Sequence, residues 1–359
     1  MSKAKVVFIG LSVTSSWGNG HATNYRGLMR ALHEDGHDVV FFERDVPWYA
    51  EHRDLPQPPW GRTILYDSLD DLRDHSEKIA EADLVVVGSY VPEGVAVGRR
   101  VCDTATGVTA FYDIDTPVTL AKLRAGDEEY LSHDLVGRYD LYLSFTGGPI
   151  LEQLERDHGA ARAEAFYCMA DPDVYRPQRV APKWDLGYLG TYSDDRQPTL
   201  DRLLLEVARG RPDLAFAVAG PQYPDAIEWP PNVTRFDHLP PERHCAYYNA
   251  QRFALNVTRR DMVAAGYSPS VRLFEAAAAG VPVISDRWVG LEEFFEPGSD
   301  ILIADGSEDV VAYLTEIDEQ ERPAIGERAR QRVLNEHTPQ VRAQQLLRLM
   351  SEQREVERV

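Results

Sequence analysis

Uninterrupted apolar runs that alternate with helical segments constrain the fold of this chain more than any other feature. The first half holds five of them: "KVVFIGL" (5–11), "HDVVFFERD" (37–45), "ADLVVVGSY" (82–90), "TAFYDID" (109–115) and "YDLYLSF" (139–145). A glycine-containing loop (12–24) and a helical pattern (25–36) separate the first two. Runs without polar alternation are typical of strands buried on both faces, and strand, loop, helix, strand is the unit of a parallel sheet. We therefore predict a Rossmann-like first half.

A second series of the same kind follows a proline-punctuated connector (171–184). Its strands are expected in "DLGYLGTY" (185–192), "LAFAVAG" (214–220), "VTRFDHL" (233–239), "FALNVTR" (253–259), "VPVISD" (281–286) and "ILIA" (301–304). A length of 359 residues suits two domains. We predict two doubly wound α/β domains, 1–177 and 178–338, and a helix over 339–359. Such sheets bind ligands at the carboxyl ends of their strands, so two of them predict a cleft at both carboxyl edges.

Charge and cysteine content narrow the range of partners. The formal net charge of −20 argues against a nucleic-acid binder, because that affinity comes from lysines and arginines that neutralise phosphates. The three cysteines show no metal-binding spacing. The apolar run near the start is too short for a secretory signal or a membrane span. We expect a cytoplasmic protein that binds small molecules.

The stretch "SPSVRLFEAAAAGVPVIS" (268–285) contains the most informative motif. With Ser268 as helix cap and Pro269 in the first turn, Ser268, Arg272 and Glu275 lie on one stripe, and Gly280 ends the helix. The helix N-terminus and the Arg272 guanidinium suit a phosphate, and the Glu275 carboxylate suits ribose hydroxyls. The alternative is a solvated ion pair on a surface helix.

This stretch resembles the nucleotide-sugar-binding helix of GT-B glycosyltransferases. Together with "FYDIDTPVTL" (111–120), "GYLGTYSDDRQPTLDRLL" (187–204) and "NVTRRDMVAAGYSPS" (256–270), it resembles the spore-maturation (CgeB-type) glycosyltransferase-like family over residues 5–345. The resemblance implies an α/β, GT-B fold of two Rossmann-like doubly wound domains facing a central cleft. It also implies that Glu275 holds the donor ribose. Many retaining members carry a second glutamate eight positions earlier, where this chain has Tyr267.

Further donor-binding residues follow other strands of the second half. Gly190 and Thr191 allow close approach of the backbone to a ligand. Arg196 stands where the resemblance implies a basic residue for the donor diphosphate, although an exposed loop arginine is the alternative. His238 and Leu239 stand where related enzymes hold the base with backbone groups.

The loop "WGNGHATN" (17–24) is the first candidate site in the first half. Gly18 and Gly20 are not followed by the third glycine of a dinucleotide-binding fingerprint. Glu43, in the second strand, is the only residue that matches the ribose-binding acid of such enzymes, so the sequence gives little support to a dinucleotide site. In related GT-B enzymes this loop covers the donor phosphates and sugar or contacts the acceptor. We expect His21 to act as a base or hydrogen-bond donor, or else only to cap its helix.

Asp113 and Asp115 close a predicted strand in "FYDIDTPVT". The D-x-D pattern resembles the metal site of GT-A glycosyltransferases, but arginines and helix N–H groups can stabilise a leaving phosphate without a metal, and we predict none. Asp115, next to the turn, is the candidate catalytic or acceptor-orienting carboxylate. The alternative is an aspartate that caps the following helix.

The prediction is a metal-independent, hexosyltransferase-like glycosyltransferase, retaining by resemblance. Its co-substrate would be a nucleoside-diphosphate sugar with no other cofactor, and its acceptor a small molecule or a glycan. The aromatic and proline-rich segment 45–62 suits stacking on a sugar or an aromatic group, or is a packed loop. The alternatives are a non-hydrolysing nucleotide-sugar epimerase and a non-catalytic nucleotide- or glycan-binding protein.

Overall fold

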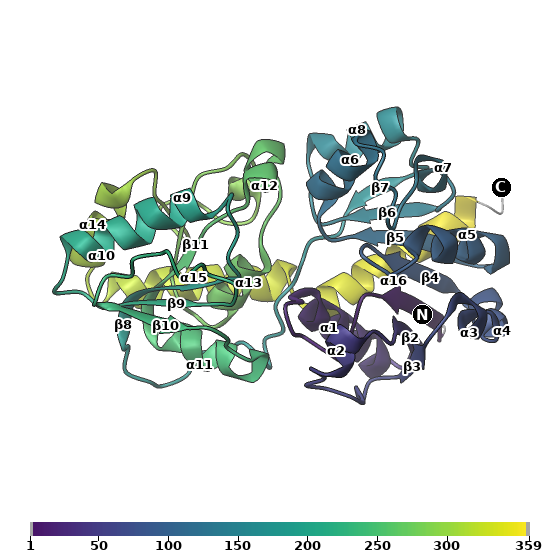
Figure 1. Cartoon of the computed structure of the whole chain (residues 1–359), viewed down its shortest axis with the longest axis horizontal. Helices are drawn as coiled ribbons and strands as arrows, with labels where there is room; N and C mark the ends of the chain where they lie inside the picture. Colours follow the sequence, from purple (N-terminus) through teal and green to yellow (C-terminus); the bar gives the residue numbers. More distant parts are fainter. Residues whose placement is uncertain (1–2, 357–359) are drawn as a thin grey trace. The chain divides into compact units, whose positions relative to one another are not determined.

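The computed structural model describes residues 3–356 and divides them into two compact units. Unit 1 comprises residues 3–167 and 339–356, and unit 2 comprises Cys168–Thr338. Each unit is a parallel sheet with helices on its faces (Figure 1). No helix within the described residues has both the length and the apolar character needed to cross a membrane.

Unit 1 contains a seven-stranded sheet in the order β3-β2-β1-β4-β5-β6-β7, with every neighbouring pair parallel. The strands are β1 (Lys5–Gly10), β2 (Asp38–Arg44), β3 (Arg62–Tyr66), β4 (Leu84–Gly88), β5 (Val108–Asp113), β6 (Leu141–Ser144) and β7 (Ala163–Ala165). The five predicted strands are confirmed. The two additional strands, β3 and β7, form the edges of the sheet.

The helices of unit 1 lie in the crossovers between these strands. They are α1 (His21–Glu34), α2 (Pro47–Ala50), α3 (Leu69–Arg73), α4 (Ser76–Ala80), α5 (Gly94–Thr104), α6 (Thr116–Arg124), α7 (His133–Val136) and α8 (Pro149–His158). The helix α16 (Pro339–Val356) packs against α1 and β5, and the Arg342 Nε donates to the Tyr167 carbonyl at 2.9 Å. The helix predicted for the end of the chain therefore belongs to unit 1; residues 357–359 lie outside the described part.

Unit 2 contains a six-stranded parallel sheet in the order β10-β9-β8-β11-β12-β13. All six strands are those predicted: β8 (Trp184–Leu189), β9 (Phe216–Ala219), β10 (Val233–Phe236), β11 (Gln251–Asn256), β12 (Val283–Ser285) and β13 (Leu302–Ile303). Their apolar side chains form one core with the helix that follows β8. The strand order reverses between β1 and β4 in the first sheet and between β8 and β11 in the second. Doubly wound sheets bind ligands at such reversals, so the loops after β1, β8 and β11 are expected ligand positions.

The helices of unit 2 cover both faces of this sheet (Figure 1). They are α9 (Gln197–Leu200), α10 (Glu206–Gly210), α11 (His244–Asn249), α12 (Arg260–Ala265), α13 (Val271–Ala278), α14 (Ser307–Glu316) and α15 (Glu321–Glu336), with short 3₁₀ turns η2 (Pro241–Arg243) and η3 (Leu291–Glu293). A π-helical turn, η1 (Asp201–Leu205), joins α9 to α10 in one continuous helix. Leu200, Leu203, Leu204 and Val207 form the buried face of this helix.

The proline-punctuated connector is a packed part of unit 2. The Tyr175 ring is buried, and its hydroxyl donates to the Glu275 carboxylate at 2.7 Å. The Arg176 carbonyl accepts from the Asn249 side chain at 3.0 Å, and Pro177 lies against Gly280. These contacts explain why unit 2 begins at Cys168, before the expected boundary near residue 178.

Candidate functional site

The helix that carries the central motif begins later than predicted. Ser270 is the residue before α13, and it holds extended backbone angles. Its hydroxyl donates to the Asn256 Oδ1 at 2.7 Å, which ties the start of the helix to the end of β11. Ser268 lies before the helix with its hydroxyl 3.1 Å from the Met262 sulfur. The prediction of Ser268 as helix cap is therefore wrong, and Pro269 also precedes the first turn.

Arg272 lies inside unit 2 at the carboxyl ends of β8 and β11. Only 7% of its surface is exposed. Its Nε donates to the Leu189 carbonyl, its Nη1 donates to the Asn256 Oδ1 at 2.9 Å, and its guanidinium stacks over the Tyr188 ring at 4.7 Å. The guanidinium is thus fixed at the edge of the sheet where a doubly wound fold binds ligands.

Gly190 provides the space for this arginine. A Cβ at Gly190 would lie 2.6 Å from the Tyr188 hydroxyl and 2.7 Å from the Arg272 Nη2. Because real Cβ atoms are not found so close to other heavy atoms, any side chain here would displace the guanidinium. Gly190 was predicted to let a ligand approach the backbone, but in the structure it makes room for the Arg272 side chain.

Arg196 lies beside the same strand end. Its guanidinium donates to the Thr191 carbonyl at 2.7 Å, and its buried Nε has no hydrogen-bond partner in the part of the chain that the structure covers. A buried, unsatisfied donor is costly, and such groups often await a ligand. Gly190, Thr191, Arg196 and Arg272 therefore form one cluster.

Glu275 lies one turn further along α13 and is 5% exposed. Its Oε1 accepts from the Tyr175 hydroxyl at 2.7 Å, and its Oε2 accepts from the Tyr248 hydroxyl at 3.1 Å. Burial raises the pKa of both tyrosines well above the usual value, so they remain donors. Glu275 and Arg272 do not pair with each other, and the alternative of a solvated surface pair is wrong. Each carboxylate oxygen keeps a second lone pair for a ligand.

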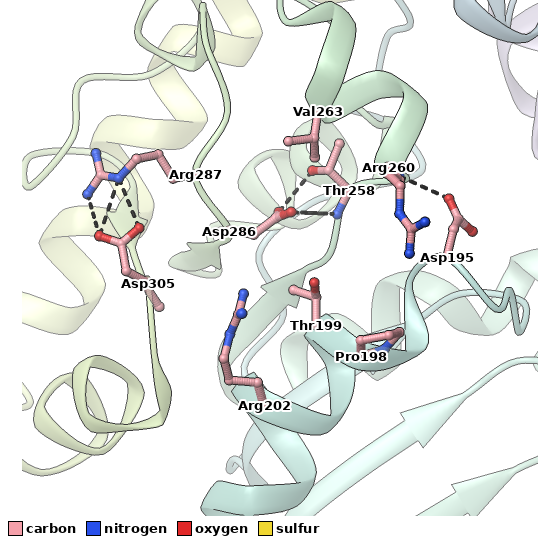
Figure 2. Close-up of a pocket in the computed structure, with 11 residues that line it drawn as sticks. Asp195, Pro198, Thr199, Arg202, Thr258, Arg260, Val263, Asp286, Arg287 and Asp305 are labelled. Atoms are coloured by element: carbon pink, nitrogen blue, oxygen red, sulfur yellow. Dashed lines mark hydrogen bonds and ion pairs between the residues drawn. The ribbon is translucent and has the colours of Figure 1, made fainter.

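A polar network at the ends of β11 and β12 extends the cluster, and the sequence analysis missed it. Asn256 donates to the Ser285 hydroxyl at 2.9 Å, and the Thr258 backbone and hydroxyl donate to Asp286 at 3.1 and 2.9 Å (Figure 2). Burial raises the pKa of the Asp286 carboxyl. The available signal was the polar residue that closes each apolar run, in "FALNVT" and "VPVISD".

Tyr267, which stands where the resemblance implied an acid, has a left-handed backbone. Its φ is 49°, unusual for a bulky residue, and its N–H donates to the Val289 carbonyl at 2.7 Å. The ring lies against Gly290, where a Cβ would come 2.6 Å from a ring carbon. The strained residue thus fixes the approach to α13.

His238 and Leu239 lie in the loop between β10 and η2. His238 is exposed. The Leu239 carbonyl is already hydrogen-bonded to the His244 ring at 2.9 Å, and the Leu239 side chain packs against the cluster of Ala217, Ala219 and Tyr247.

In unit 1, Glu43 is committed to holding the loop that follows β1. The buried carboxylate accepts from the backbone N–H groups of Val13 and Thr14 at 2.7 and 2.9 Å and from the hydroxyls of Ser12 and Thr14 at 2.9 and 2.6 Å. Glu43 is therefore not available to a ribose, which agrees with the absence of a complete dinucleotide fingerprint in this loop. Its function is to set the path of the glycine loop.

That loop places His21 at the first position of α1. Gly18 has a φ of +60°, which glycine adopts without strain, whereas Gly20 has an ordinary helical backbone and open space around it. The His21 N–H donates to the Asn19 side chain at 3.1 Å, and its ring lies 5.7 Å from the Phe145 ring. Burial lowers the pKa of the imidazole to about 3, so His21 is neutral at pH 7. Its buried Nδ1 has no partner within residues 3–356.

The two aspartates of "FYDID" have different surroundings. Asp113 is fully buried and accepts from Tyr142 at 2.5 Å and Thr119 at 2.8 Å, and burial raises its pKa to about 6. Asp115 is half-buried and accepts from the Tyr90 hydroxyl at 3.0 Å. It precedes α6, but its side chain makes no capping hydrogen bond. Among the described residues, no group of three or more His, Cys, Asp or Glu side chains is arranged to hold a metal ion.

The chain is similar to known proteins in part of its sequence and in its fold. Residues 196–348, which include Arg272 and Glu275, match the family model described as glycosyl transferase-like. Sucrose-phosphate synthase from Thermosynechococcus elongatus superposes with a TM-score of 0.69 at 16% identity, over 98% of this chain and 99% of that one. Anabaena HepE in complex with UDP and glucose gives a TM-score of 0.71 at 14% identity, over 97% and 100%.

This is the GT-B fold. An alpha-glucosyltransferase in complex with UDP-glucose and DNA shares it, with a TM-score of 0.70 and 11% identity over 98% of this chain and 100% of that one. A comparison with curated protein sequences gives no significant match. Unit 2 holds most of the glycosyl transferase-like region of this GT-B chain.

Proposed function

We propose that this GT-B protein is a glycosyltransferase that moves a sugar from a nucleoside-diphosphate sugar to a hydroxyl of a small molecule or glycan. The observation that carries the proposal is the buried Arg272 at the carboxyl edge of unit 2, within the region that matches the glycosyl transferase-like family. An arginine that is buried without a carboxylate partner, beside the unsatisfied Arg196 Nε, is suited to a diphosphate.

In the proposed donor complex, Arg196 and Arg272 bind the diphosphate and Glu275 accepts hydrogen bonds from the ribose hydroxyls. The backbone near His238 would contact the base, with Gly190 and Thr191 beside the phosphates. Two of the similar structures contain UDP or UDP-glucose, which makes uridine the first base to test.

The proposed transfer breaks the bond between the anomeric carbon and the phosphate oxygen. The electron pair leaves with the nucleoside diphosphate, whose charge Arg196 and Arg272 stabilise without a metal ion. The acceptor oxygen bonds to the anomeric carbon with retention of configuration, and its proton passes to the Asp115 carboxylate. His21, neutral at pH 7, would serve as a hydrogen-bonding group and not as the base.

Unit 1 offers an aromatic surface for the acceptor. The rings of Trp17 and His52 are stacked at 4.5 Å, and Trp48, which is 56% exposed, lies 5.7 Å from His52. The backbone of this segment is fixed, since Arg26 holds Asp54 at 2.8 Å. Exposed rings on a fixed loop suit stacking on a sugar or an aromatic group.

A binding assay and a product assay together test the proposal. UDP, GDP, ADP, CMP, dTDP and their common sugars would be compared by thermal shift, with Arg272→Lys and Glu275→Gln in parallel. A ligand at ~100 times its Kd adds about 2.7 kcal/mol of stability. We expect one nucleotide to stabilise the protein and both variants to weaken that effect.

The product assay separates the transferase from its two rivals. Release of nucleoside diphosphate that depends on an added acceptor supports transfer. Interconversion of the sugar without any acceptor indicates an epimerase, and binding without turnover of any donor indicates a non-catalytic protein. A panel in which no nucleotide shifts the melting temperature would rule out the donor site itself.

A further inference from the structure

A cavity of about 260 Å³ in unit 2 lies beside the donor cluster and is not used by the proposed transfer (Figure 2). It is formed at the ends of β11, β12 and β13 and is bordered by α9, η1 and α12. Its floor is Thr258 and Asp286, and Arg202, Arg260 and Arg287 stand around it.

The carboxylates that border the cavity already have partners within the protein. Arg287 forms an ion pair with Asp305 at 2.9 Å. Asp195 accepts from the backbone N–H of Arg260 at 2.9 Å. Asp286 accepts from the backbone and hydroxyl of Thr258. The described residues contain no cluster of three metal-ligating side chains, so these acids do not constitute a cation site.

Two of the three guanidinium groups around the cavity keep their hydrogen-bond donors free of protein acceptors within the described residues. The side chains of Arg202 and Arg260 make no hydrogen bond or ion pair within residues 3–356. They come from different elements, η1 and α12, and point into the same space with Thr199 between them (Figure 2). Both side chains are exposed to solvent, and the pair with Arg287, together with the nearby Arg202, holds the pKa of Asp305 below its usual value. The N–H groups of Arg202 and Arg260 are therefore hydrated and remain available to an anion in the cavity.

The element that carries Arg202 has an unusual geometry. η1 is a π-helical turn inserted in an otherwise α-helical segment, and such turns are frequent at functional sites because they re-aim side chains. Here the turn coincides with the residue that faces the cavity.

We propose that this cavity binds the phosphate group, either as free phosphate or as the phosphoryl group of a small phosphate ester. Arginine presents a planar fork of donors that matches phosphate oxygens, and Thr199 adds a hydroxyl. The cavity is slightly smaller than a typical site for a drug-sized molecule, which suits a small, polar ligand. The site shares Thr258 and Asp286 with the polar network beside the donor cluster, but its arginines are not those of the donor cluster, and the proposal does not depend on glycosyl transfer.

Isothermal titration of the full chain with inorganic phosphate, in a low-salt buffer without phosphate, tests the proposal. We expect Arg202→Ala and Arg260→Ala each to weaken binding about ten-fold or more, because each removes a charged donor. Arg209→Ala is the matched control: Arg209 is exposed on the same continuous helix, lies outside this cavity, and should leave the affinity unchanged. Melting temperatures without phosphate confirm that each variant folds.

A further variant separates this cavity from the donor cluster, which also attracts phosphate. Binding that persists in Arg196→Ala and is lost in Arg202→Ala supports the proposal, whatever the outcome of the nucleotide assays. The reverse pattern places phosphate in the donor cluster and overturns it, as does the absence of binding at millimolar phosphate.

Glucose 6-phosphate as a second titrant distinguishes the two sources of the group. Tighter binding than inorganic phosphate, sensitive to Arg202→Ala, identifies a phosphate ester. Equal or weaker binding with the same sensitivity identifies the free ion. If Arg202→Ala and Arg260→Ala both leave the affinity for glucose 6-phosphate unchanged, the assignment of the phosphate site to this cavity is wrong.

Discussion

Glu275 contributes to stability as well as to the proposed donor site. Replacing it by alanine leaves the hydroxyls of Tyr175 and Tyr248 buried without an acceptor. Since each of the two unsatisfied groups costs about 1–3 kcal/mol, we expect Glu275→Ala to lower the free energy of unfolding by about 2–6 kcal/mol. Glu275→Gln keeps one acceptor and should cost less than half as much. Urea unfolding measures the stability of both variants. Equal losses of unfolding free energy would show that the hydrogen bonds from Tyr175 and Tyr248 to Glu275 do not stabilise the fold.

Asp113 should make the stability of the protein depend on pH. Its folded pKa of about 6 lies above the usual value of 3.8 because of burial, so the folded state binds more protons than the unfolded state between these values. The contribution of Asp113 therefore falls as the pH rises from about 4 to 6, by up to ~3 kcal/mol. We expect Asp113→Asn to remove this component, seen as a smaller loss of unfolding free energy across that range than in the wild type.

Gly190 allows binding and folding to be separated. An alanine there would push the Arg272 guanidinium away from the Tyr188 ring. We expect Gly190→Ala to weaken nucleotide binding ten-fold or more while lowering stability by about 1–3 kcal/mol, the usual cost of one extra methyl group in a packed site. A thermal-shift titration gives both values, and unchanged nucleotide affinity would show that Arg272 is not a ligand.

At the level of elements, every predicted strand is present, because uninterrupted apolar runs distinguish buried parallel strands from their surroundings. The two strands that were missed lie at the sheet edges. β3 has mostly polar or half-buried positions, and β7 has three residues, so neither has a long apolar run. The start of α13 was misplaced because Ser268 and Ser270 are equally good caps by type, and only the bond from Ser270 to Asn256 decides between them.

The site was predictable where chemistry follows local sequence. Arg272 and Glu275 share a helix, so their proximity follows from spacing. Their partners do not: Tyr175 and Tyr248 are far from Glu275 in sequence, and only the folded connector and α11 bring them together. The role of Glu43 could not be predicted for the same reason, since this residue of β2 binds the loop after β1, which is distant in sequence.

The contact between α15 and the end of α13 gives a prediction for a single element. Gly326 in α15 lies against the Gly280 carbonyl, where a Cβ would clash. Alanine favours a helix interior by about 1 kcal/mol over glycine, but forcing the elements apart costs about 1–3 kcal/mol. We therefore expect Gly326→Ala to be neutral or destabilising in chemical unfolding. Gly210→Ala, at the end of α10 with open space around it, should be neutral or stabilising.

At the scale of the whole molecule, unit 1 depends on a helix that follows unit 2 in the sequence. Leu346, Leu347 and Leu349 of α16 are buried, and each contributes about 1.5–3 kcal/mol. Their sum approaches the total stability of a typical domain, ~5–15 kcal/mol. A chain that stops at Thr338 should therefore lose hydrogen-exchange protection in β1 to β7. The six-stranded sheet of unit 2 should keep its protection, and equal loss in both units would contradict this division.

The chain leaves unit 1 at Tyr167 and returns to it at Pro339, so unit 2 is an uninterrupted stretch placed within a divided one. During translation, unit 2 can therefore complete its fold before unit 1, although the synthesis of unit 1 begins first. Residues 168–338 leave the ribosome together and can finish folding, whereas the seven-stranded sheet, synthesised first, waits for α16. A nascent chain released before α16 is synthesised would therefore expose an incomplete seven-stranded sheet.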